Sequence, residues 1–191
     1  MSDAPDDPPR LDDAALARRR TALAHVGKYG DPVLRERARP VEAFDDALRE
    51  EIDTMAALME DAFGAGLAAT QLGILHRVVV YRTPGDPGSP VRALVNPEIA
   101  WASDERERFP EGCLSLPDVW VDVERPASVR VVARDRDGGE VVVEASGAEA
   151  SVLQHEIDHL DGVLILDRIG RAERKGAMRV LREGQSTSVA P

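Results

Sequence analysis

Two histidines and a glutamate with a fixed spacing are the residues of this chain best suited to chemistry. His155 and His159 are four positions apart, with Glu156 between them, in the segment QHEIDHLDG. Four residues make little more than one helical turn, so on a helix both imidazoles project from one face and can bind one metal ion. Glu156 can then reach a water molecule beside the metal, accept its proton and return it during hydrolysis. The pattern indicates a metal-dependent hydrolase; a surface helix with two solvated histidines is the alternative.

A third protein ligand decides which class of hydrolase this is, because hydrolytic metal sites usually have three ligands and one open position. One class of zinc protease would have a third histidine where Ile165 stands. Another uses a downstream glutamate, but Glu173 and Glu183 lie in a basic segment with no second motif around them. Cys113, in EGCLSLP, is the best remaining candidate, although a single cysteine is more often a small buried apolar residue. A thiolate with two imidazoles forms a tetrahedral site whose fourth ligand is water.

The glycine-rich stretch GAGLAATQ, residues 64–71, offers a second candidate site. It lacks the third glycine of a dinucleotide-binding loop and precedes a strand, so that function is a poor match. Small residues allow close approach of a ligand's backbone, and the amide of Gln71 can donate to a developing oxyanion. Taken alone, however, the stretch is more typical of a helix end followed by tight packing.

Two helices and several strands must position these residues. Asp45 is expected to cap a helix that Gly64 ends, and the S-x-x-E pattern from Ser146 opens the helix that carries the histidines, ending near Leu160 with Gly162 as its stop. Strands are expected over 74–82 and 91–100, and a hairpin over 127–145. The first helix has apolar residues every three or four positions, at Leu48, Ile52, Met55, Met59 and Ala62.

This order of elements predicts an α+β fold, in which mixed or antiparallel sheets pack around the metal-binding helix in a single domain. The domain is expected over 25–183, after an extension over 1–24 that is expected to be mobile, with a helical stretch over 14–24, and before a polar tail over 184–191.

Composition limits the cellular setting. One cysteine cannot form an internal disulfide, and no apolar run is long enough to span a membrane, so we expect a cytoplasmic protein without a membrane partner. The net charge of -11 argues against general DNA binding. The segment 168–183 is nevertheless basic, with six Arg or Lys against two Glu.

Three motifs in one order closely resemble peptide deformylase. They are G-x-G-x-A-A-x-Q at 64–71, E-G-C-x-S at 111–115 and H-E-x-x-H at 155–159, and YGDPVLR at 29–35 is similar to the family's N-terminal segment. The resemblance spans about residues 25–180. It implies removal of the formyl group from the N-formylmethionine of new bacterial polypeptides, with release of formate.

The resemblance also implies roles for particular residues. One divalent metal ion, typically Fe(II) with zinc, nickel or cobalt as substitutes, would bind Cys113, His155 and His159, and Glu156 would be the general acid and base. The remaining roles concern the substrate. Gln71 and the backbone N–H of Leu114 would stabilise the tetrahedral intermediate, Gly66 would hydrogen-bond the extended peptide beside Ala65, and Val152 would line the methionine pocket.

Two other functions compete with this interpretation. A metallopeptidase lacks a suitable third ligand, and a non-catalytic, metal-binding or ribosome-associated relative would not need all the predicted catalytic residues. The basic segment from Arg168 to Arg182 is expected to contact the ribosome, as the resemblance also implies; a merely solvated helix face is the alternative.

Overall fold

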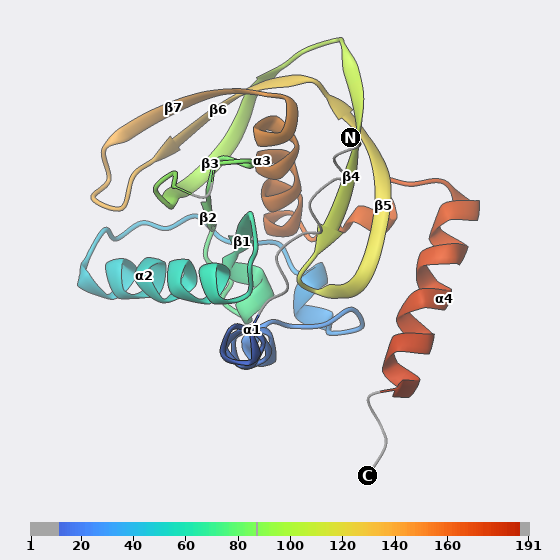
Figure 1. Ribbon diagram of the computed structural model, residues 1–191. Helices are drawn as coiled ribbons and strands as arrows, with labels where there is room; N and C mark the ends of the chain where they lie inside the picture. The colour runs from blue at the N-terminus through green and yellow to red at the C-terminus, as the bar shows by residue number, and fades with distance from the viewer. Residues whose placement is uncertain (1–11, 87, 188–191) are drawn as a thin grey trace, which may run out of the picture.

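Residues 12–86 and 88–187 are described by a computed structural model, and this part of the chain forms four α-helices and two antiparallel sheets (Figure 1). The larger sheet has five strands in the order β1-β2-β3-β6-β7, and β4 pairs with β5 in a separate hairpin. The predicted α+β fold is confirmed. The strands are β1 (Gly66–Ala68), β2 (Val78–Tyr81), β3 (Arg92–Ala102), β4 (Arg106–Cys113), β5 (Leu116–Pro126), β6 (Ser128–Arg134) and β7 (Glu140–Ser146).

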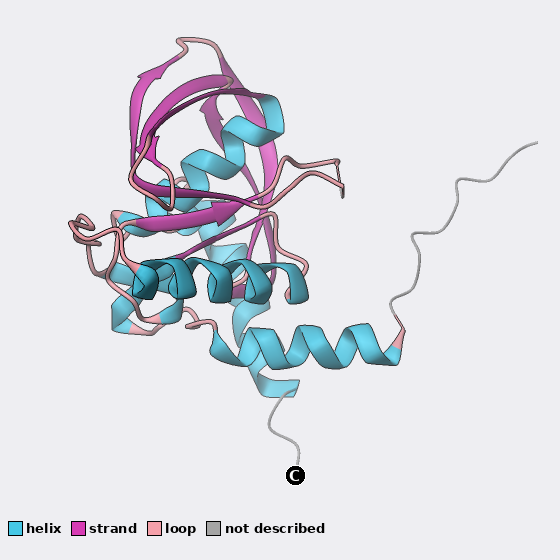
Figure 2. Cartoon of the chain, turned by 90° about the vertical axis from the view of Figure 1, so that its left-hand side faces the viewer, coloured by secondary structure: helices cyan, strands magenta, loops and turns pink. Residues whose placement is uncertain are grey.

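The helix that carries the two histidines, α3 (Gly147–Leu160), lies between the two sheets (Figures 1 and 2). Its apolar residues Leu153, Ile157 and Leu160 are buried in one cluster with Val79 and Tyr81 of β2. Its length agrees with the prediction, and Gly162 follows it with a left-handed φ of 73°. Because strands of both sheets contact α3, packing fixes the position of the helix that carries the histidines.

Strand β2 is buried on both faces because a helix covers each one. Val79 and Tyr81 face α3, whereas Val78 and Val80 pack against α2 (Asp46–Asp61). Asp45 caps α2, as predicted, by accepting a hydrogen bond from the Leu48 N–H at 3.1 Å. The end of α2 differs from the prediction.

The left-handed residue that ends α2 is Phe63, with a φ of 57°, rather than Gly64. The Gly64 N–H then donates to the carbonyl of Met59 at 2.9 Å. This change of direction leads the chain directly into β1, a strand that the sequence did not predict within the glycine-rich stretch.

Residues 12–24 differ from the mobile extension that was predicted, because they form most of α1 (Asp13–His25), which packs beside α2 (Figure 2). Ala15 and Ala22 are buried, and Arg18 pairs with Asp61 at 3.7 Å. The predicted helix over 14–24 is thus present, while residues 1–11 lie outside the described part of the chain.

The basic segment forms α4 (Arg171–Thr187), which packs on β5 through Ala177 and Leu181. The helix continues past Gly184, where the polar tail was predicted to begin, and residues 188–191 lie outside the described part. Among the described residues, no helix is sufficiently long and apolar to cross a membrane.

Candidate active site

Helix α3 begins without the capping box that its sequence suggested. Ser146 is the N-cap residue, but its side chain makes no capping hydrogen bond. Glu149 instead lies 3.7 Å from the guanidinium of Arg92 and accepts a hydrogen bond from Thr83. The stability of the helix therefore comes from its burial between the sheets and not from a capping box.

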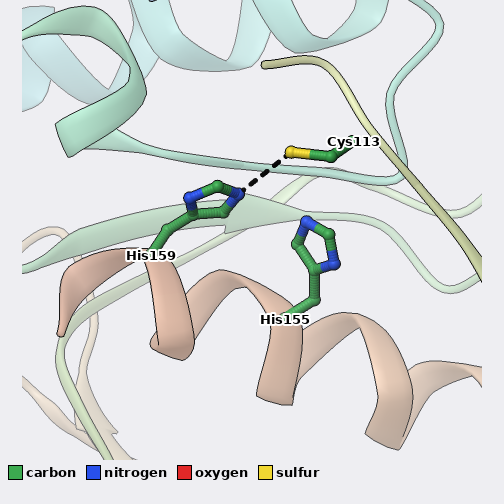
Figure 3. Close-up of side chains that lie close together, drawn as sticks. All are labelled: Cys113, His155 and His159. Carbon is green, nitrogen blue, oxygen red and sulfur yellow. Dashed lines mark hydrogen bonds between the residues drawn. The ribbon is translucent and has the colours of Figure 1, made fainter. Parts of the chain in front are cut away.

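His155 and His159 project from one side of α3 toward Cys113, which lies at the end of β4 (Figure 3). One potential ligand atom from each of the three side chains lies within 4.8 Å of the other two. The Cys113 Sγ is 3.2 Å from the His159 Nε2. The His155 Nδ1 is occupied by a hydrogen bond to Glu111, so the Nε2 of His155 is the nitrogen left for a ligand bond. The structure thus brings the three predicted ligands together.

The donor set fits a divalent transition metal. One sulfur and two imidazole nitrogens converge, and soft or borderline ions such as zinc and iron favour these donors. Burial raises the pKa of the Cys113 thiol, but the neighbouring His159 and His155 outweigh burial, so its pKa lies well below the usual value. A readily formed thiolate is the form of cysteine that binds metals.

Glu156 lies in the same cleft, next to the ligands but not among them. Its side chain is buried, and its Oε2 has no hydrogen-bond partner among the described residues. Burial raises the pKa of this carboxyl group. A buried carboxylate without a partner is costly, so the free oxygen indicates that a water molecule, metal ion or substrate completes the site.

Gly66 of β1 makes room for Glu156. A Cβ at position 66 would lie only 2.7 Å from the Glu156 Cγ, closer than real Cβ contacts allow. The backbone of β1 therefore lies directly against the Glu156 side chain, and only glycine leaves room for this contact. Because β1 is an edge strand, an extended peptide can lie beside it.

The Gln71 side chain is fixed beside Cys113. Its Oε1 accepts a hydrogen bond from the Ala68 N–H at 2.9 Å, and its Nε2 donates to the Ser115 Oγ at 3.1 Å. The same Nε2 is 3.8 Å from the Cys113 Sγ. The amide is thus oriented with its donor end toward the candidate metal centre.

A buried ionic network, which the sequence analysis missed, holds His155. Glu111 accepts hydrogen bonds from the His155 Nδ1 at 2.9 Å, from the Ser151 Oγ at 2.8 Å and from two nitrogens of Arg125 at 2.5 and 3.0 Å. Arg125 of β5 also donates to Asp158 of α3 at 2.9 Å. The pKa of Glu111 is about 2: burial raises it, but the hydrogen bonds from His155 and Arg125 lower it more. The sequence offered no clear signal for Arg125, which stands in the segment VDVERP, where charged residues alternate with valines.

Cys113, His155 and Glu156 line a cleft of about 720 Å³, and His159 lies beside it, next to Cys113. The predicted substrate residues Ala65, Gly66 and Val152 line it, as do Gln71 and Leu114. Leu23 and Arg19 of α1 also line the cleft, although the sequence placed them in a mobile extension. All nine predicted site residues therefore lie in or beside one cavity.

A metal-binding helix between two antiparallel sheets, with a neighbouring buried glutamate and an apolar cleft, defines a metal-dependent hydrolase. The profile of the polypeptide deformylase family matches residues 23–175, and this chain belongs to that family. Its members are metal-dependent enzymes that remove the formyl group from N-formylmethionyl peptides.

Individual relatives of this chain are also peptide deformylases. Peptide deformylase 1 of Corynebacterium glutamicum is 46% identical over 161 residues, which are 84% of this chain and 95% of that protein. Peptide deformylase of Thermotoga neapolitana is 48% identical over 152 residues, 80% of this chain and 90% of that protein.

Solved structures show the same fold. A peptide deformylase from Legionella pneumophila superposes with a TM-score of 0.81 at 38% identity, covering 87% of this chain and 98% of that one. Peptide deformylase 1B of Arabidopsis thaliana, in complex with an inhibitor, gives a TM-score of 0.79 at 35% identity, covering 86% and 91%. These matches support the deformylase interpretation and not the metallopeptidase or the non-catalytic alternative.

Proposed function

We propose that this chain deformylates N-formylmethionyl peptides with Glu156 as its general acid and base. The observation that carries the proposal is the buried Glu156 carboxylate, which has a free oxygen in the cleft that also receives the three convergent ligand atoms. Cys113, His155 and His159 would hold the metal ion, for which we propose Fe(II). When bound, the ion would supply Lewis-acid activation of a water molecule and of the formyl oxygen.

Glu156 moves the protons of the reaction. It accepts a proton as water attacks the formyl carbon, and it donates that proton to the amine as the C–N bond breaks. Formate and a free N-terminal methionine result. The Gln71 amide and the Leu114 N–H donate to the oxygen that becomes negatively charged in the tetrahedral intermediate.

The substrate lies along β1 in this proposal. Its backbone hydrogen-bonds to Gly66 beside Ala65, and the methionine side chain packs near Val152. Ala65 and Ser151, which also line the cleft, have small side chains.

The direct test is release of formate from a formyl-Met peptide by protein that is purified and assayed without oxygen. The matched acetyl-Met peptide and an internal peptide bond should not be cleaved. Elemental analysis of the same sample identifies the metal. Absence of formate release by metal-loaded protein would reject the proposal, whereas cleavage of the internal bond would favour a metallopeptidase.

We further propose that the chain works in the cytoplasm and contacts the ribosome through α4. Arg168 of this segment pairs with Asp158, and Arg174 lies 3.8 Å from Asp167. The outward-facing basic residues recur at helical spacing, so they form one stripe that an RNA backbone could contact. They are Arg171, Lys175, Arg179 and Arg182, all exposed.

Ribosome co-sedimentation tests this contact. Replacement of the four stripe residues by glutamine should weaken binding and its dependence on salt. The matched control neutralises four exposed arginines of the remaining surface and should not. They are Arg37, Arg106, Arg108 and Arg130. Equal binding of both variants and wild type would reject the α4 contact.

A further inference from the structure

Helix α1, most of which precedes the family match, forms a wall of the active-site cleft. Arg19 and Leu23 line the same cavity as His155 and Glu156. The family profile begins to match at residue 23, so Arg19 lies before the matched segment. Most of α1, including Arg19, therefore precedes the matched segment, whereas Leu23 lies within it.

Contacts from the middle of α1 and from just beyond its last turn fix the position of this wall. Arg18 pairs with Asp61 at the end of α2, just before the Ala62–Gly66 stretch that also lines the cleft. Just beyond the last turn, the Lys28 Nζ donates to the carbonyls of Leu23 at 2.6 Å and Val26 at 2.8 Å, and to that of the cleft residue Leu114 at 3.5 Å. These contacts hold the last turn of α1 beside the cleft.

Arg19 brings an unpaired positive charge to this wall. Its side chain is exposed, and no described residue forms a hydrogen bond or ion pair with its guanidinium, in contrast to the neighbouring Arg18. Lys28 is close enough to interact with it electrostatically, so a second cation lies near this wall.

The carboxylates of the cleft do not neutralise Arg19. Glu111 is bound to Arg125, and Glu156 is buried beside the metal ligands. The third, Asp118, lies toward α4, where its Oδ2 would be 3.9 Å from a Cβ at Gly184. The α1 side of the cleft therefore presents an available guanidinium.

We propose that Arg19 is a specificity residue that binds a carboxylate of the peptide within the two residues after the formylmethionine. This inference rests on the proposed deformylase function. With the formyl group at the metal ligands, the rest of the peptide leaves along the cleft, of which α1 is a wall. The planar guanidinium matches a carboxylate with two parallel hydrogen bonds, so acidic N-termini are deformylated faster than basic ones.

The test compares kcat/KM for formyl-Met-Asp-Ala and formyl-Met-Ala-Asp with the matching lysine peptides, all amidated at the C-terminus. For at least one position, the wild type should prefer aspartate by about 3-fold, the size expected of an exposed ion pair. Arg19→Glu should reverse the preference at that position. About 0.5 M salt should reduce it in the wild type.

Arg20→Glu is the matched control, because Arg20 is on the same helix, is exposed and does not line the cleft. It changes the net charge by the same amount and should keep the wild-type ratio. An unchanged ratio in Arg19→Glu, or equal shifts in both variants, would overturn the role of Arg19. Failure of the wild type to deformylate any of the peptides would instead overturn the proposed function.

Discussion

At the scale of single residues, the site depends on side chains that are close but have different roles. Cys113 and the two histidines offer ligand atoms, whereas the Glu156 Oε2 has no hydrogen-bond partner among the described residues. Gly66 allows this arrangement because it has no side chain where the Glu156 carboxylate lies.

Gly66→Ala should reduce kcat/KM for the formyl-Met peptide by about 100-fold, because the new methyl group displaces Glu156 and small misplacements of catalytic groups have effects of this order. Metal content should stay the same, since none of the ligands is touched. Gly176→Ala on α4 is the control, as a Cβ there meets nothing within 4 Å. Activity of Gly66→Ala within twofold of wild type would show that the contact does not matter.

At the scale of elements, the buried network joins β4, β5 and α3. Arg125 is 3% exposed and binds carboxylates on two different elements, Glu111 and Asp158. Asp158 is also paired with Arg168, just before α4. The network therefore links the hairpin that carries Cys113 to the helix that carries His155.

Arg125→Met should destabilise the fold by about 3–5 kcal/mol, because removal of one partner leaves buried carboxylates uncompensated. Urea unfolding measures this. Arg130→Met on β6 breaks an exposed pair with Glu144 and should cost less than about 1 kcal/mol. Similar losses in the two variants would mean that burial does not strengthen the network.

The sequence predicted the elements whose apolar pattern is regular and missed those whose pattern is not. The spacing in α2 and the alternation in the β6–β7 hairpin identified both. The β4–β5 hairpin was missed because β4 is rich in charge and β5 buries Leu116, Val119 and Val123 at unequal intervals. A register shift at Gly112 and Cys113 contributes to this irregularity.

The site residues could be predicted where a local pattern fixes their arrangement, and could not be predicted elsewhere. His155, Glu156 and His159 were predictable because one helix fixes their relation, and Cys113 followed from the need for a third ligand. Arg125 and Arg19 were not, since each reaches the site only through contacts between elements far apart in the chain.

At the scale of the whole molecule, protonation of Glu111 at low pH should lower the free energy of unfolding. The pKa of this carboxyl group is about 2 in the folded protein and about 4.5 without its partners, so the charged form is stabilised by folding. That contribution, about 3 kcal/mol, is fully present above pH 4.5 and is lost as the pH falls toward 2.

Urea unfolding between pH 5 and pH 3 should therefore show a steeper loss of stability in wild type than in Glu111→Gln, which cannot titrate there. Metal dissociation at low pH affects both proteins, so the difference between them isolates Glu111. Parallel curves would show that Glu111 does not have the lowered pKa.

The central claim, that Glu156 transfers the proton at a metal site it does not itself form, has one direct test. Formate release by Glu156→Ala is measured together with its bound metal, beside Glu149→Ala on the first turn of the same helix. We predict a fall of about 10²- to 10⁴-fold in kcat for Glu156→Ala with metal still bound, and little change for Glu149→Ala. Full activity of metal-loaded Glu156→Ala would contradict the account.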